Sequence, residues 1–114
     1  MRTLKPKESQ IQKALVNLHR LAGLAGTLLA HIPNGEKRAI ATALKLKAMG
    51  VLPGMPDLLC GSPSHGIFFL ELKRPGGRTS NAQKETQELL RTFGVEVLTA
   101  DSLNDAIVIL AERG

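Results

Sequence analysis

Apolar residues recur first at helical spacing and then in a short run along the N-terminal half of the chain. From residue 6 to about residue 21 they lie three or four positions apart, which predicts an amphipathic helix with Glu8 in its first turn, where the helix dipole favours an acid. A short apolar run over about 27–31 ends at a Pro-Asn-Gly turn signal and predicts a strand. Helical spacing returns over 38–49, and Gly50 is a typical residue to end that helix.

Two apolar runs in the middle of the chain, 58–60 and 67–72, predict a β-hairpin, because the turn-forming segment Gly-Ser-Pro-Ser-His-Gly separates them. Side chains alternate between the faces of a strand, so Glu71 and Lys73 point the same way from the second strand. If the hairpin closes at the middle of the turn segment, Asp57 lies opposite Glu71 or the residue before it. We therefore expect these three charged side chains to converge.

The C-terminal third has the pattern of a helix, a strand and a further helix. Ser80 and Gln83 have the spacing of a capping box, which predicts a helix from here to residue 93. Residues 95–99 alternate like a strand, and 102–111 have the pattern of a final helix.

This order of elements predicts one α/β domain spanning residues 1–114. The last strand follows a helix that itself follows the hairpin, so it can lie parallel to the second hairpin strand through a right-handed crossover. We expect a mixed sheet of about four strands flanked by helices.

The composition adds a basic charge and little aromatic surface. Lys and Arg number 15 against 10 Asp and Glu, which gives a net charge of +5 and favours a polyanionic partner. The chain has no Trp or Tyr, and Phe68, Phe69 and Phe93 fall in patterns that predict burial, so a base-stacking platform for single strands is not expected. Contacts to the phosphate backbone of a duplex suit this composition better.

The sequence carries no signal for a membrane or for a zinc site. No apolar run reaches the length of a spanning helix, and no signal-peptide core follows the basic N-terminus, so we expect a cytoplasmic protein, in the host cytoplasm if it is viral. Cys60 lies in an apolar strand and is interpreted as a core residue. His19, His31 and His65 lack metal-ligand spacing.

The three converging charges favour a hard divalent cation. Two clustered carboxylates repel each other and lose solvation when partly buried, and a cation would neutralise them. Mg²⁺ or Mn²⁺ suits Asp57 and Glu71, and the Leu72 carbonyl is a third candidate ligand. Lys73 could orient an attacking water or stabilise charge developing on a phosphate. This equipment suits phosphodiester hydrolysis, although the Glu-Leu-Lys triplet taken alone is more typical of a solvated strand end.

The spacing of these residues resembles a known family. Pro56-Asp57 followed by Glu71-x-Lys73 at the end of an apolar strand is similar to the PD-(D/E)xK nucleases. A fuller string resembles the VRR-NUC family, the virus-type replication-repair nucleases, over residues 8 to about 106: Gly54-x-Pro56-Asp57-Leu58, Glu71-Leu72-Lys73 and Gly76-Gly77-Arg78-x-Ser80-x-x-Gln83.

The resemblance implies two further site residues and the fold of that superfamily. Glu8 matches the N-terminal-helix glutamate that completes the active site of the family, where it would meet the metal through water. Gln83 matches an active-site glutamine. Gln83 also has a local role as a helix cap, and we expect the two roles to exclude each other unless the side chain leaves its cap.

Six basic residues are candidates for DNA contacts. Four flank or lie in the second predicted helix, where a solvated helix face is the competing interpretation, and two lie in the loop after the hairpin, where a guanidinium can bind phosphate with two donors. They are Lys37, Arg38, Lys45, Lys47, Arg74 and Arg78. The glycines of that loop lack Walker spacing, so no nucleotide cofactor is expected.

Together these features predict a Mg²⁺- or Mn²⁺-dependent DNA endonuclease. The resemblance implies a symmetric homodimer that cuts branched DNA such as four-way (Holliday) junctions, because two sites would serve two strands. Three alternatives are a DNA-binding module of the same fold that has lost its chemistry, a nuclease directed to flaps or nicks, and a small interaction subunit. Leu24, Leu28, Val51 and Leu52 are candidates for apolar surface that a second copy would cover.

Overall fold

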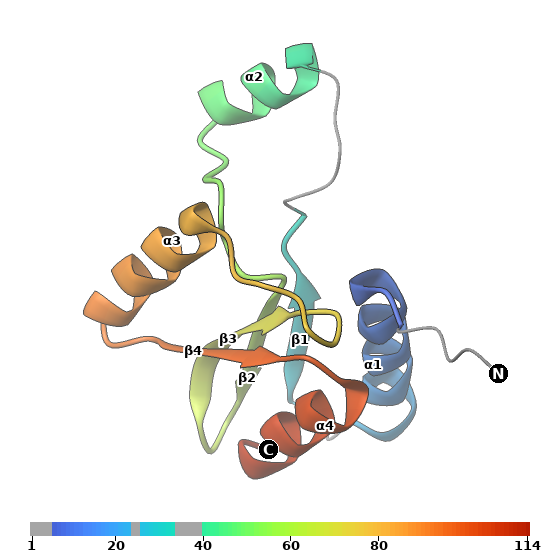
Figure 1. Cartoon of the computed structure of the whole chain (residues 1–114). Helices are drawn as coiled ribbons and strands as arrows, with labels where there is room; N and C mark the ends of the chain where they lie inside the picture. The colour runs from blue at the N-terminus through green and yellow to red at the C-terminus, as the bar shows by residue number, and fades with distance from the viewer. Residues whose placement is uncertain (1–5, 24–25, 34–39) are drawn as a thin grey trace, which may run out of the picture.

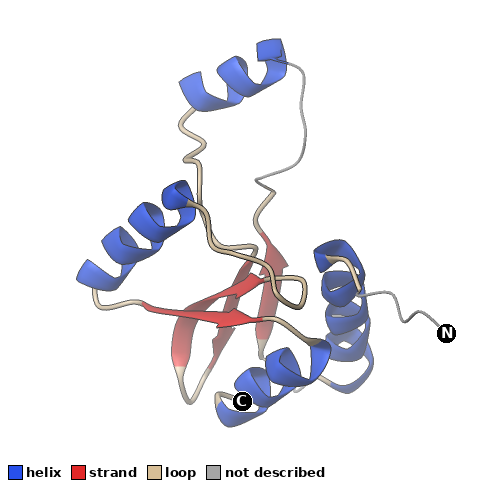
Figure 2. Ribbon diagram, viewed as in Figure 1, coloured by secondary structure: helices blue, strands red, loops and turns tan. Residues whose placement is uncertain are grey.

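The strands of the chain form a single mixed sheet with helices on both faces (Figures 1 and 2). The structure is a computed structural model that describes residues 6–23, 26–33 and 40–114. The elements in chain order are α1 (Glu8–Ala22), β1 (Leu28–His31), α2 (Ile40–Ala48), β2 (Leu58–Ser62), β3 (Gly66–Leu72), α3 (Asn81–Thr92), β4 (Glu96–Ala100) and α4 (Leu103–Glu112). Each matches an element expected from the sequence pattern, with ends shifted by one or two residues.

The four strands lie in the order β1-β2-β3-β4, which confirms the predicted mixed sheet. β1, β2 and β3 pair in antiparallel fashion, whereas β4 lies parallel to β3. A parallel neighbour cannot be reached by a tight turn, so α3 carries the chain across the sheet between β3 and β4. This crossover places α3 directly after the end of β3.

The hairpin of β2 and β3 has the register that brings its charged residues together. Leu58 pairs with Leu70, so the next pair along the ladder joins Asp57 to Glu71. The turn is short because Ser62 pairs with Gly66, which has a φ of 87° that favours glycine. The predicted convergence of Asp57 and Glu71 is thus a direct result of hairpin closure.

Alternation along β3 divides the sheet into an apolar face and a face that carries the charges. Phe68, Leu70 and Leu72 are buried against α1 and α4, which supply Ile11, Leu15 and Ala106 to the same core. Figure 1 shows α1 and α4 side by side, and their residues are in contact. The opposite face receives α3. No helix in the described part of the chain is long and apolar enough to cross a bilayer.

α2 stands away from the sheet in Figure 1, and residues 49–57 connect it to β2. Its residue Leu44 is 63% exposed, and Met49, directly after the helix, is 71% exposed. Because β1 ends and β2 begins at the edge of the sheet where β3 ends, α2 is attached at the same end of the sheet as the charged residues.

The expected burial of Phe93 was wrong, since this side chain is 68% exposed. Phe93 follows α3 six positions after Gln87, which is buried against the sheet. In a helix of 3.6 residues per turn, six positions place a side chain about 120° around the helix axis, away from the side that packs on the sheet. An apolar residue at a helix end is therefore not a reliable sign of burial.

Candidate active site

Asp57 is held in place by backbone groups of the neighbouring strands. The Leu72 N–H of β3 donates to Asp57 Oδ2 at 2.7 Å. The Asp57 carbonyl accepts from the Ile32 N–H at 2.7 Å and is 3.0 Å from His31 Nδ1. These contacts tie the start of β2 to the ends of β1 and β3, so the carboxylate has a defined direction. His31 therefore contacts the site through the backbone carbonyl of Asp57.

Glu71 is a nearly inaccessible carboxyl group with another acid beside it. Its residue exposure is 1%, and Gln87 Nε2 donates to Glu71 Oε2 at 2.9 Å. The pKa of Glu71 is raised from 4.5 to about 9, mainly by burial and then by the hydrogen-bonded carboxyl of Asp57, whereas the charge of Lys73 acts to lower it. Glu8 also acts on the pKa of Glu71 through its charge, which places the first residue of α1 near the site.

Lys73 is fixed at both its backbone and its ammonium group. The residue is 7% exposed, its N–H donates to the Ala100 carbonyl of β4 at 2.8 Å, and its Nζ donates to Gln83 Oε1 at 2.6 Å. A buried ammonium needs such a partner because desolvation penalises its charge. Lys73, directly after β3, therefore lies on the same face as Glu71 and is held beside the two acids by its hydrogen bonds.

The expectation that Gln83 must choose between its cap and the active site was wrong. Gln83 Oε1 accepts from the Ser80 N–H at 2.9 Å while it also accepts from Lys73 Nζ. The Gln83 N–H donates in turn to Ser80 Oγ at 3.2 Å, which completes the capping box. The cap and the contact with Lys73 occur together because an amide oxygen has two lone pairs. The N-terminus of α3 is thereby joined to the lysine.

The residues present fit a hard cation at this site. Two carboxylates are a sufficient protein contribution for Mg²⁺, which keeps several of its waters. The raised pKa of Glu71 reflects its burial and then the neighbouring Asp57 carboxyl, and a divalent ion would favour the ionised form of Glu71. No cluster of three or more His, Cys, Asp or Glu side chains able to hold a metal occurs within residues 6–23, 26–33 and 40–114. The Leu72 carbonyl stays a predicted ligand, while the N–H of that residue is taken by Asp57.

The candidate DNA contacts fall into two groups around this end of the sheet. Arg74 and Arg78 are exposed in the loop between β3 and α3, immediately after Lys73. Lys45 and Lys47 are exposed on α2. Lys37 and Arg38 lie outside the described residues. The loop arginines are nearest to the acids in sequence, whereas the lysines depend on where α2 lies.

Gln87 was not singled out from the sequence, although the structure buries it against Glu71. A signal for it exists: Gln83 and Gln87 are four positions apart, so a helix presents both on one face. Gln83 stands out in the sequence because it belongs to the motif of the VRR-NUC family and to the capping box of α3. Gln87 belongs to neither. Its role depends on the docking of α3 against β3.

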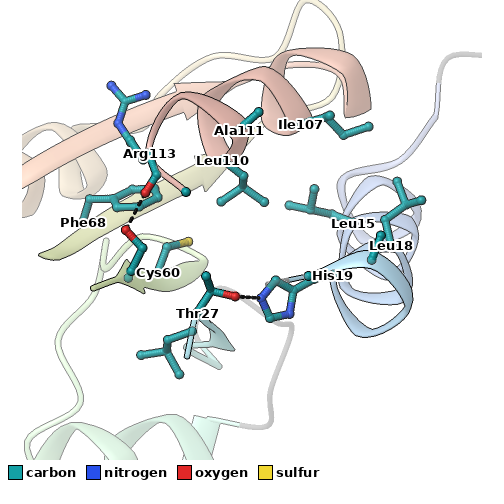
Figure 3. A pocket seen from close by; sticks show the side chains of 16 residues that line it. Leu15, Leu18, His19, Thr27, Cys60, Phe68, Ile107, Leu110, Ala111 and Arg113 are labelled. Carbon is teal, nitrogen blue, oxygen red and sulfur yellow. Dashed lines mark hydrogen bonds between the residues drawn. The ribbon is translucent and has the colours of Figure 1, made fainter. Parts of the chain in front are cut away.

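A pocket lies on the apolar face of the sheet, away from the acids. This pocket of about 580 Å³ is bounded by α1, α4 and the sheet, and Figure 3 shows Leu15, Leu110 and Phe68 around it. Cys60 also lines it but is fully buried, and burial raises the pKa of its thiol to about 12. None of the acidic residues described above borders this pocket, so it is separate from the candidate active site.

Comparison with known proteins agrees with this geometry. A model of the VRR-NUC domain family matches residues 1–103. A solved structure named "VRR_NUC domain protein" superimposes with a TM-score of 0.78 at 23% identity, over 99% of this chain and 90% of that one. Another, named "VRR_NUC domain", gives a TM-score of 0.61 at 22% identity, over 91% of this chain and 94% of that one. The search of curated proteins gave no match. The chain therefore belongs to the VRR-NUC family, and it is a nuclease-type domain that acts on DNA.

Proposed function

We propose that this protein is a metal-dependent endonuclease that hydrolyses phosphodiester bonds in DNA. The observation that carries the proposal is the buried Glu71 carboxyl held beside Asp57, with the ammonium of Lys73 two residues further along the same strand face. Burying two neighbouring carboxyl groups is unfavourable for folding unless a counter-ion neutralises them, so the arrangement indicates a functional site. The family membership supplies the reaction class, and the geometry supports the residues that perform it.

Asp57 and Glu71 would hold Mg²⁺ or Mn²⁺, with the Leu72 carbonyl as a further ligand and Glu8 in contact through water. When bound, the ion supplies Lewis-acid polarisation of the scissile phosphate. Asp57 is directed by the Leu72 N–H and Glu71 by Gln87, so the two carboxylates need little rearrangement to face one ion. Preorganisation of this kind is what an electrostatic active site requires.

Lys73 would act on the phosphate or on the attacking water. Its ammonium is held by the oxygen of Gln83, and a positive charge at a fixed position stabilises the negative charge that develops in the transition state. Arg74 and Arg78 would bind neighbouring phosphates of the DNA backbone as bidentate donors. The chain thus has separate groups for metal, transition state and backbone.

A cleavage assay with variants tests this proposal. We expect Mg²⁺ and Mn²⁺ to support cleavage, EDTA to abolish it, and Ca²⁺ to permit DNA binding with little turnover. Glu71→Ala should remove most of the cleavage and keep much of the DNA affinity, because the basic contacts persist. Glu85→Ala, which removes an exposed carboxylate of α3, is the charge-matched control and should cleave like wild type.

The outcomes separate the three function classes. Full activity in EDTA would reject metal dependence. DNA binding without cleavage by the wild-type protein would instead support the inactive binding module, and neither binding nor cleavage would leave an interaction subunit. If circular dichroism shows that Glu71→Ala is unfolded, the loss of activity would report a structural role for this residue.

We further propose that the working unit is a symmetric homodimer that cuts branched DNA. One domain offers one site, and a four-way junction requires cuts in two strands related by approximate two-fold symmetry. Support comes from uncovered apolar side chains: Leu28, Val51 and Leu52 are 44%, 37% and 53% exposed. Leu24, the fourth residue expected to be uncovered, lies outside the described residues. Val51 and Leu52 follow α2 and offer, together with it, a surface that a second copy would bury, while Leu28 lies at the other end of β1.

A further inference from the structure

Gln87 is an uncharged polar residue buried against the most deeply buried acid of the site. Its residue exposure is 3%, that of Glu71 is 1%, and the Gln87 Nε2 to Glu71 Oε2 distance is 2.9 Å. A buried amide that lost this bond would leave a donor and a carboxylate oxygen unsatisfied. The contact therefore constrains both side chains.

The contact is part of a register between a helix and a strand. Gln83 and Gln87 are four positions apart on α3, about 6 Å along a helix axis. Lys73 and Glu71 are two positions apart on β3, about 6.6 Å along a strand. Because the two spacings match, one face of α3 makes two hydrogen bonds with the same face of the strand. Gln83 bonds to Lys73, and Gln87 bonds to Glu71.

We propose that Gln87 is a positioning residue, which holds the Glu71 carboxylate in the orientation that binds the divalent cation. This inference rests on the proposed metal-dependent function. An amide donor suits this task because it stabilises the ionised carboxylate without bringing a charge that would compete with the cation. It also reaches the carboxylate from the α3 side, while Asp57 reaches it from β2. Hydrogen-bond partners of this kind orient metal ligands in other proteins, and their loss weakens metal binding by about 10- to 100-fold.

The competing explanation is that Gln87 only fastens α3 to the sheet. Two variants distinguish these roles. Gln87→Met has a side chain of similar length without the donor. Val97→Ala truncates a core residue of β4, which is 5% exposed and pairs with Phe69, two positions before Glu71 on the same face of the sheet. Both variants loosen packing, and only the first removes the contact with Glu71.

The first measurement is calorimetric titration of Mn²⁺ into the full chain without DNA. We expect Gln87→Met to bind Mn²⁺ about 10- to 100-fold more weakly than wild type, and Val97→Ala to bind it as wild type does. The second is DNA cleavage over a range of Mn²⁺ concentrations. The half-saturating concentration should rise for Gln87→Met, and the rate should recover toward wild type at saturation.

The outcomes are distinct. Unchanged Mn²⁺ affinity in folded Gln87→Met, or an equal loss of affinity in Val97→Ala, overturns the positioning role. The proposed nuclease function stands in that case if the wild-type protein cleaves DNA. If Gln87→Met does not fold, Gln87→Asn, which withdraws the amide by one carbon, must weaken Mn²⁺ binding in the same direction, and unchanged binding overturns the inference. A wild-type protein that neither binds Mn²⁺ nor cleaves overturns the proposed function, and this inference with it.

Discussion

At the scale of single residues, the site depends on polar and charged side chains that are buried and held by specific hydrogen-bond partners. Lys73 is the clearest case, because its ammonium is buried and hydrogen-bonded to Gln83 Oε1. A cation in this position is expected to contribute to the transition state more than to the fold. Glu71 differs from it, because burial raises the pKa of this carboxyl by more than the charge of Lys73 lowers it.

Lys73→Ala should lower the cleavage rate by about 100-fold or more, which is typical for the loss of one electrostatic stabiliser. Mn²⁺ binding should survive, since no metal ligand is removed. Lys73→Arg should not restore the rate, because a planar guanidinium occupies the space differently from a compact ammonium. Single-turnover cleavage measures the rate, and activity within a few-fold of wild type in Lys73→Ala would show that the residue is only a strand-end charge.

At the scale of elements, the position of α3 relative to the hairpin decides the site, and Gly54 controls that position. Its φ is 81°, and a Cβ at this residue would lie 2.2 Å from the Ala82 carbonyl oxygen and 2.7 Å from the Gln83 nitrogen. The loop before β2 therefore packs directly on the first turn of α3. A side chain larger than hydrogen would push the two apart.

Gly54→Ala should destabilise the fold more than Gly50→Ala and should also reduce cleavage. Gly50 is the matched control because its φ is 97° and a Cβ there would meet nothing within 4 Å. Both changes pay the cost of a positive φ, about 1 kcal/mol or more, and only Gly54→Ala adds the clash with α3. Urea denaturation measures the difference in stability. Equal losses in the two variants would mean that α3 accommodates the added Cβ at residue 54 without a loss of stability.

At the other end of the sheet, an ion pair joins Glu96, the first residue of β4, to Arg113 at the C-terminus of α4. Arg113 donates to both carboxylate oxygens of Glu96 at 2.7 and 3.0 Å, and His65 Nε2 lies 3.0 Å from Glu96 Oε1. The hydrogen bond from Arg113, helped by His65, lowers the pKa of Glu96 from 4.5 to about 2. The folded state thus favours the ionised carboxylate.

Glu96→Gln should lower the stability of the protein at neutral pH but not near pH 2. A lowered pKa in the folded state gives stabilisation that is present above 4.5 and is lost as the pH falls toward 2. The gap in denaturation midpoint between wild type and variant should therefore close over this range. Glu112→Gln, whose carboxylate is 3.4 Å from Arg113 and more exposed, should show a smaller gap. A gap independent of pH would contradict the ion pair.

At the scale of the whole molecule, the proposed dimer and its DNA preference are tested together. Light scattering at micromolar concentration should give about twice the chain mass of 12.2 kDa. Leu52→Asp, which places a charge on the exposed apolar surface next to α2, should shift the protein toward monomer. A synthetic four-way junction should be cut faster than a linear duplex of the same sequence. A strict monomer that cuts both substrates equally would reject the dimer and the junction preference, and would leave the metal-dependent nuclease standing.

Local patterns in the sequence determined the elements and the meeting of the acids. The hairpin register follows from a turn and two apolar runs that are adjacent in sequence, so Asp57 was expected opposite Glu71 or the residue before it, and the observed register selects Glu71. The capping box of Ser80 and Gln83 was equally local and is present as predicted. Interactions of this range are decided by neighbours within a few residues, and they do not depend on how the helices dock.

Only the tertiary structure decided which side chains complete the site. The contact of Gln87 with Glu71 joins residues 16 positions apart, and it exists because α3 crosses the sheet with its glutamines facing β3. The exposure of Phe93 and the double role of Gln83 have the same origin, since both depend on which face of α3 meets the sheet. A helical period shows that a helix has a buried side, but the partner of that side is set by packing between elements that are distant in sequence.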